Sequence, residues 1–120
     1  MAKKILKTAI EVKDSSKAEE GNGIVKHIKP GSYVIALSEE GKAFSSIEFA
    51  KLMKQISDEK AYLSFVIGGP DGLSEEVKNR ADIIISLSKM TFTHEMCRLF
   101  LIEQIYRASM INTDRRYHRV

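Results

Sequence analysis

The sequence of 120 residues has few of the features that build disulfide-linked or membrane-inserted proteins. Its single cysteine, Cys97, excludes an intramolecular disulfide framework and fits a reducing compartment. No apolar run approaches the roughly 20 residues of a membrane span. Near the start, Lys7 follows Ile5 and Leu6 directly, so no apolar signal-peptide core is present. We therefore expect a cytoplasmic protein that does not enter a membrane.

The motifs that bind polyphosphates and metals are also absent. Neither the GxGxxG spacing nor the Walker loop occurs, and two acidic residues, Glu75 and Glu76, follow the glycine-rich stretch at 68–72, where they would repel phosphate. The three histidines have no metal-ligand spacing, and neither CxxC nor HExxH occurs. We expect neither a nucleotide with several phosphates nor a metal site.

What the chain does have is ordinary globular composition, with 43% hydrophobic and 29% charged residues. This composition and length predict one domain with its own core. The net charge is +3, and basic residues crowd both ends of the chain, at Lys3, Lys4, Lys7, Arg115, Arg116 and Arg119. Such a balance permits an anionic partner such as nucleic acid without requiring one.

Apolar runs of strand length alternate with helical patterns along the chain. The expected strands cover residues 5–12, 33–37, 62–67 and 83–87, and the last three are apolar enough to be buried. The expected helices cover residues 24–28, 45–56, 74–80 and 93–110, with polar loop at 13–23. Ser45 and Glu48 match a capping box at the start of the second helix. This alternation predicts an α/β fold, a parallel sheet with helices on both faces.

The stretch from Phe65 to Ser74 is the first site candidate. An apolar strand ends there in glycines and is followed by a helix cap at Ser74, which leaves backbone groups facing a crevice. A neutral or cationic ligand held by backbone contacts fits this stretch better than a phosphate does. The alternative is a tight turn with no ligand.

The last helix is apolar almost all round, which indicates burial on more than one side and therefore a second subunit beside it. Its apolar residues are Met96, Cys97, Leu99, Phe100, Leu101, Ile102, Ile105, Tyr106 and Met110. Among them, Cys97 is expected to be a buried, inert thiol. His94 makes either a polar contact at the helix start or a site contact. The basic tail is either a disordered end or an RNA contact.

Four motifs in order resemble one family, the RlmH-type pseudouridine methyltransferases of large-subunit ribosomal RNA, which belong to the SPOUT class. The motifs are Ile67–Leu73, Ser86–His94, Glu103–Ala108 and Tyr117–Arg119, and the likeness runs from Lys29 to the C-terminus. The resemblance implies one knotted domain over residues 1–120, with a C-terminal trefoil knot in the α/β fold. It also implies a homodimer packed through the knotted region.

The resemblance further implies S-adenosylmethionine as cofactor and ribosomal RNA as substrate. The cofactor-binding residues it implies are Leu37, Gly68, Gly69, Ser88, Lys89, Met90, Thr91, Phe92 and Thr93. The substrate-binding residues are His94, Arg107, Arg115 and Arg116. The catalytic residues are Tyr117, His118 and Arg119, where Arg119 positions phosphate or base and His118 accepts a proton or orients the substrate.

One departure from the family concerns the start of the chain. Members usually have a further strand and helix before the strand expected at 5–12, and this unit is missing here. Either the chain is a shortened variant, or the strand at 5–12 takes a different place in the sheet. The rival to an active enzyme is therefore a non-catalytic module that keeps the knot, the dimer and the cofactor pocket.

Overall fold

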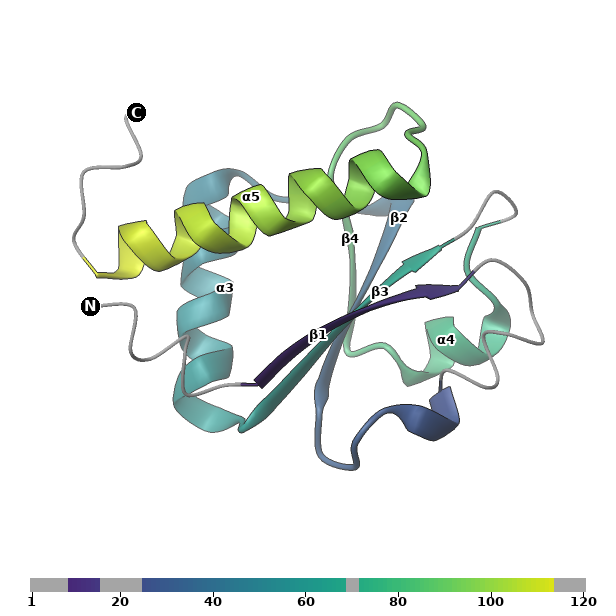
Figure 1. The fold of residues 1–120 in the computed structure, drawn as a ribbon, viewed down its shortest axis with the longest axis horizontal. Coiled ribbons are helices and arrows are strands. Elements are labelled where there is room, and N and C mark those ends of the chain that lie inside the picture. Colours follow the sequence, from purple (N-terminus) through teal and green to yellow (C-terminus); the bar gives the residue numbers. More distant parts are fainter. Residues whose placement is uncertain (1–8, 16–24, 69–71, 114–120) are drawn as a thin grey trace.

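The computed structural model describes residues 9–15, 25–68 and 72–113. Four parallel strands form one sheet in the order β1-β3-β2-β4. They are β1 (Ala9–Ser15), β2 (Tyr33–Ala43), β3 (Tyr62–Gly68) and β4 (Ile83–Ser86). The helices are α3 (Ser46–Glu59), α4 (Glu75–Arg80) and α5 (His94–Asn112). The predicted parallel α/β architecture is confirmed, and Figure 1 shows the helices on the two faces of the sheet.

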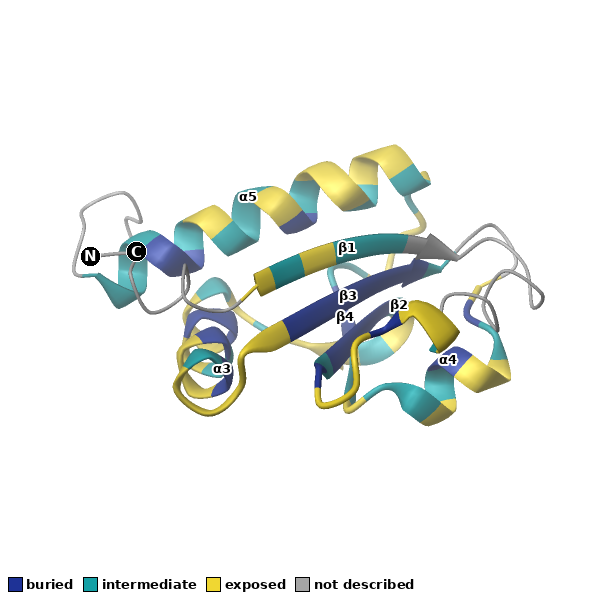
Figure 2. Ribbon diagram, turned by 60° about the horizontal axis from the view of Figure 1, so that its bottom comes forward, coloured by how far each residue is buried: buried dark blue, intermediate teal, exposed yellow. Residues whose placement is uncertain are grey.

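Each face of the sheet has its own hydrophobic core. On one face, α3 and α5 cover Ile35, Phe65 and Ile67 with side chains that include Phe49 and Leu101. On the other face, α4 and a single helical turn at 25–27 cover the smaller cluster of Ile28, Val34, Ala36, Val66, Leu73 and Val77. The central strands β2 and β3 are therefore the buried ones, as Figure 2 shows.

Most element boundaries agree with the sequence, because local capping determines them. The capping box is present: the Ser45 hydroxyl accepts from the backbone N–H of Glu48, whose carboxylate accepts from the N–H of Ser45. These bonds lower the pKa of the Glu48 carboxyl. Ser74 and Thr93 cap α4 and α5 through their hydroxyls alone, which accept from the backbone N–H groups of Val77 and Met96.

Three expectations for the strands need correction. Residues 13–15, expected in a loop, continue β1, because their backbone pairs with Val66, Ile67 and Gly68 of β3. β2 does not end at Leu37 but resumes at Lys42 after an irregularity. β4 is only partly buried, since it forms a sheet edge and only Ile85 and Ser86 have little exposure. Residues 5–8 of the first expected strand lie outside the described residues.

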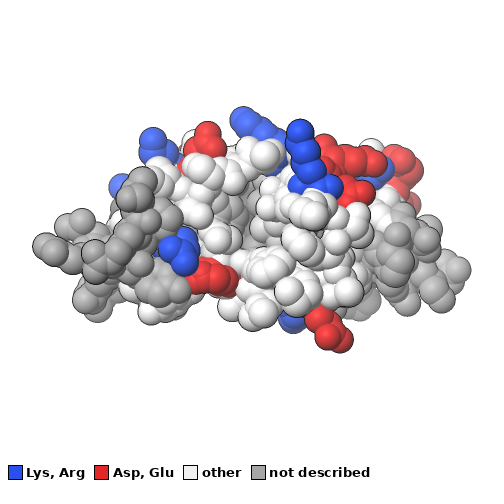
Figure 3. Space-filling model, turned by 90° about the horizontal axis from the view of Figure 1, so that it is seen from above, with Lys and Arg blue, Asp and Glu red and all other residues white. Residues whose placement is uncertain are grey.

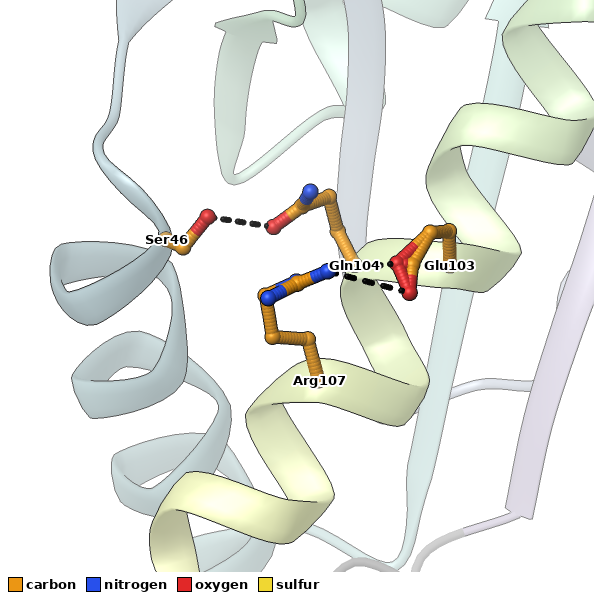
Figure 4. A network of polar contacts seen from close by, with 4 residues as sticks. All are labelled: Ser46, Glu103, Gln104 and Arg107. Carbon is orange, nitrogen blue, oxygen red and sulfur yellow. Dashed lines mark hydrogen bonds and ion pairs between the residues drawn. The ribbon is translucent and has the colours of Figure 1, made fainter. Parts of the chain in front are cut away.

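Polar contacts fasten α5 to α3 beyond their apolar packing. The Ser46 hydroxyl at the start of α3 donates to Oε1 of Gln104 over 2.7 Å, as drawn in Figure 4. At the other end of α5, the Asn112 amide donates to the carbonyl of Ala50 over 3.0 Å. The two bonds hold α5 along the sheet, so that its first turn lies beside the ends of β2 and β4.

Candidate functional site

The loops that follow β2, β3 and β4 meet at the carboxyl edge of the sheet, as they must when all strands are parallel. Together with the first turn of α5 they enclose a cleft of about 660 Å³. Its walls are Leu37, Ser38, Glu39, Glu40, Ile67, Gly68, Gly72, Leu87, Ser88, Met90, Thr91, Phe92, Thr93, His94 and Cys97. This is the edge where open α/β sheets bind ligands.

The first wall is a bulge of β2. The strand pairs Leu37 with Ile85, leaves the ladder, and pairs Lys42 with the same Ile85, so residues 38–41 bulge out of the sheet toward the cleft. Gly41 lets the bulge close, because a Cβ there would lie 2.6 Å from the carbonyl carbon of Ile85 and 2.8 Å from that of Ile84. Only glycine fits this approach of two backbones.

The second wall is the glycine turn after β3. A Cβ on Gly68 would lie 3.1 Å from the carbonyl carbon of Gly72 and 3.1 Å from Cδ2 of Leu73, so the turn folds closely onto itself. Gly72 has a φ of +82°, a left-handed conformation that favours glycine. Both glycines line the cleft with backbone. Gly69, also expected to bind cofactor, lies outside the described residues.

The third wall, between β4 and α5, is held by its own hydrogen bonds. The Ser86 hydroxyl donates to the carbonyl of Ser88 over 2.8 Å, and the Ser88 hydroxyl accepts from the N–H of Met90 over 3.0 Å. The Phe92 ring meets Phe100 of α5 edge-on, with ring centres 5.0 Å apart. This loop therefore has a defined shape.

One hydrogen bond joins the first wall to the third. The Thr91 hydroxyl donates to Oε2 of Glu39 over 2.6 Å. The acidic residues that line the cleft are Glu39 and Glu40, the lining also includes His94, and none of the described lining residues is a lysine or arginine. Burial raises the pKa of the Cys97 thiol, which is half-buried and lines the cleft. The cleft thus favours a cationic or neutral ligand.

Most of the expected cofactor residues meet at this cleft. Those that line it are Leu37, Gly68, Ser88, Met90, Thr91, Phe92 and Thr93. Lys89 belongs to the same loop but is not part of the lining. Among the expected substrate residues, His94 lines the cleft, whereas Arg107 lies farther along α5 and pairs with Glu103 at 3.2 Å (Figure 4).

The remaining expected site residues, Arg115, Arg116, Tyr117, His118 and Arg119, lie outside the described residues. Sequence reasoning missed the acidic bulge, because the strand expected at 33–37 ends before Glu39, Glu40 and Gly41. A signal was available: these residues follow a buried strand, and such positions lie at the ligand-binding edge of a parallel sheet.

Residues 9–15, 25–68 and 72–113 form neither a metal-ligand cluster nor a membrane-spanning helix. No group of three or more histidine, cysteine, aspartate or glutamate side chains there is placed to hold a metal ion. Over the same ranges, the helices are too short or too polar to cross a bilayer.

Comparison with known proteins identifies the family. The family model described as "Predicted SPOUT methyltransferase" matches residues 2–118. The ribosomal RNA large subunit methyltransferase H of Parasynechococcus marenigrum is 48% identical over 110 residues, which cover 92% of this chain and 75% of the relative. The protein of the same name from Clostridioides difficile is 51% identical over 104 residues, which cover 86% of this chain and 65% of the relative. The resemblance inferred from the motifs is confirmed, and the chain belongs to the SPOUT methyltransferase family.

Proposed function

We propose that this methyltransferase transfers the methyl group of S-adenosylmethionine to a ring nitrogen of pseudouridine in large-subunit ribosomal RNA. The observation that carries the proposal is the cleft at the carboxyl edge of the sheet, where most of the expected cofactor residues come together. Relatives at 48% and 51% identity are named as methyltransferases of large-subunit ribosomal RNA, which supports the choice of substrate.

The cleft fits S-adenosylmethionine in size and in charge. Its volume of about 660 Å³ lies within the range of roughly 300–1,000 Å³ usual for small-molecule sites. The ligand carries a sulfonium cation and no phosphate, so acidic walls suit it. Leu37, Leu87 and Phe92 supply apolar contact for an adenosine, and the backbone at Gly68 and Gly72 is open to close approach.

When bound, S-adenosylmethionine supplies an electrophilic methyl group: its carbon–sulfur bond breaks with the electron pair going to sulfur, while the ring nitrogen bonds the methyl carbon and loses its proton. The chain's own residues hold the reactants in line, which is the main source of rate for such a displacement. We assign contact with the incoming nucleotide to His94, which lines the cleft.

Residues of the tail complete the proposed site. We assign proton removal or orientation of the base to His118, with Tyr117 beside it, and phosphate or base positioning to Arg119, Arg115 and Arg116. The resemblance supports this assignment. His118→Ala is expected to lower methyl transfer at neutral pH while S-adenosylmethionine binding is retained. If His118→Ala transferred the methyl group at the full rate, His118 would not be the group that accepts the proton.

We propose that the chain is a single knotted domain and acts in the cytoplasm as a homodimer. The outer face of α5 supports the dimer: Met96, Leu99, Ile102 and Tyr106 are 41%, 59%, 50% and 51% exposed in one chain. Their spacing places them on one side of the helix. Figure 3, which views the molecule over α5, shows uncharged atoms across the middle of this face and charged side chains mostly toward its margins.

Titration of the chain with S-adenosylmethionine in a calorimeter, followed by transfer of a labelled methyl group to ribosomes, tests the proposed function. Binding followed by transfer is the expected result. Binding without transfer would favour a non-catalytic module. Absence of binding would overturn the assignment of the cleft.

A further inference from the structure

The bulge of β2 forms the acidic wall of the cleft and carries two carboxylates. Glu39 and Glu40 line the cleft because β2 leaves its ladder after Leu37 and rejoins it at Lys42. The bulge is not a loose loop. Gly41 lies against the backbone of β4 so closely that no other side chain fits, which anchors the residues just before it.

The Glu39 carboxylate is also oriented within the cleft. Its Oε2 accepts a 2.6 Å hydrogen bond from the hydroxyl of Thr91, across from the bulge on the loop after β4. Thr91 is itself a lining residue, so the bond lies at the cleft and not on a remote surface. A carboxylate has several acceptor positions, and one bond from a hydroxyl leaves the others for a ligand.

The charge of the carboxylate is not offset by a basic residue in the lining. The described residues that line the cleft include no lysine or arginine. Lys42, the nearest lysine in sequence, lies over the ring of Phe44, with 5.4 Å between its Nζ and the ring centre. A cation in the cleft therefore meets a wall with a net negative charge.

We infer that Glu39 makes the cleft prefer S-adenosylmethionine to S-adenosylhomocysteine, an inference that rests on the proposed function. The two molecules share their adenosine and their amino-acid group. They differ in the methyl group and in one positive charge, because the sulfonium becomes a neutral thioether when the methyl leaves. The Glu39 carboxylate attracts the positive sulfonium of S-adenosylmethionine, whereas it has no such attraction for the neutral thioether of S-adenosylhomocysteine. The residue therefore favours loading of fresh cofactor and release of the spent product.

The test compares the dissociation constants of both molecules by calorimetry for the wild-type chain and its variants. Glu39→Gln keeps the size and the acceptor oxygen but removes the charge. It is expected to weaken S-adenosylmethionine binding about two- to fivefold, the usual range for an exposed charge pair, and to leave S-adenosylhomocysteine binding unchanged. Glu39→Asp, which keeps the charge, is expected to retain most of the preference.

Glu59→Gln is the matched control, because Glu59 is an exposed carboxylate at the end of α3, beside the amino end of β3 and away from the cleft. It should change neither constant. Equal weakening of both ligands in Glu39→Gln would overturn the inference, since it would mean a hydrogen bond to their shared part. An unchanged ratio of the two constants would overturn it as well.

The outcomes separate this inference from the function on which it rests. If the wild-type chain binds neither molecule, both the proposed function and the inference are wrong. If the wild-type chain binds both molecules and Glu39→Gln does not alter the ratio of the two dissociation constants, only the inference is wrong. Because the ratio compares two ligands on one protein, partial unfolding of a variant does not affect it.

Discussion

Gly41→Ala is expected to distort the cleft, because it adds a Cβ where the bulge of β2 lies against the backbone of β4. The added Cβ would lie 2.6 Å from the carbonyl carbon of Ile85 and 2.8 Å from the carbonyl carbon and oxygen of Ile84. All three are backbone atoms of β4 and cannot rotate away. To reach ordinary contact, the bulge and β4 must separate by roughly 0.5–1 Å, and overpacking of this kind costs about 1–3 kcal/mol.

The separation also moves the carboxylate wall of the cleft. We therefore expect Gly41→Ala to lower the free energy of unfolding by about 1–3 kcal/mol and to weaken binding of S-adenosylmethionine. Denaturant unfolding measures the first effect, and calorimetric titration of the folded variant measures the second.

Gly31→Ala is the control for stability alone. Gly31 has a φ of +83° and no heavy atom within 4 Å of its would-be Cβ, in the turn before β2 and away from the cleft. An alanine in this conformation costs about 1–2 kcal/mol, so this variant should lose comparable stability and keep its cofactor affinity. The steric account of the bulge would be refuted if Gly41→Ala unfolded like the wild type and bound S-adenosylmethionine equally well.

Further predictions concern the pairing of helices, the thiol, the phenol of Tyr33 and the dimer. Ser46→Ala removes the 2.7 Å bond to Gln104 and should cost about 0.5–1.5 kcal/mol in denaturant unfolding. Cys97, whose pKa is raised by burial, should react with iodoacetamide more slowly than a free cysteine. With S-adenosylmethionine in the cleft, the reaction should be several-fold slower still. Equal rates with and without the cofactor would contradict the place of Cys97 in the lining. Burial, and then the charge of Asp82, raise the pKa of the Tyr33 phenol above 10.0. The unfolded chain therefore loses the phenol proton at a lower pH than the folded chain, and the free energy of unfolding should fall as the pH rises above 10. Tyr33→Phe should make this fall shallower. Leu99→Glu on the apolar face of α5 should halve the molar mass measured by sedimentation, because it places a charge in the proposed dimer interface. Lys51→Glu, an exposed position of α3, should leave the mass unchanged. A monomeric wild-type chain would contradict the dimer.

Local patterns in the sequence predicted most of the fold. Ser45 and Ser74 cap helices as predicted, and the apolar runs at 33–37 and 62–67 form the buried centre of the sheet. The ends of these strands also predicted a crevice at the edge of the sheet where the cleft lies. These features depend on residues close together in the chain, which is why the sequence reveals them.

The features that the sequence did not reveal depend on distant partners. Gly41 has its role because of Ile84 and Ile85, which lie more than forty residues later, so the bulge resembled an ordinary turn. Likewise, residues 13–15 are polar but become strand through pairing with β3. The prediction of cofactor-binding residues required the family resemblance, since strand ends alone indicate a crevice and not its ligand.

Methyl transfer to ribosomal RNA is the central reaction proposed for this chain, and nucleoside analysis measures it directly. Ribosomes from a bacterial strain that lacks this methylation would be incubated with the chain and S-adenosylmethionine, and the large-subunit RNA digested and analysed by mass spectrometry. The account predicts one pseudouridine converted to its ring-methylated form, with at most one methyl group per ribosome. Unmodified RNA from a chain that binds S-adenosylmethionine would contradict it.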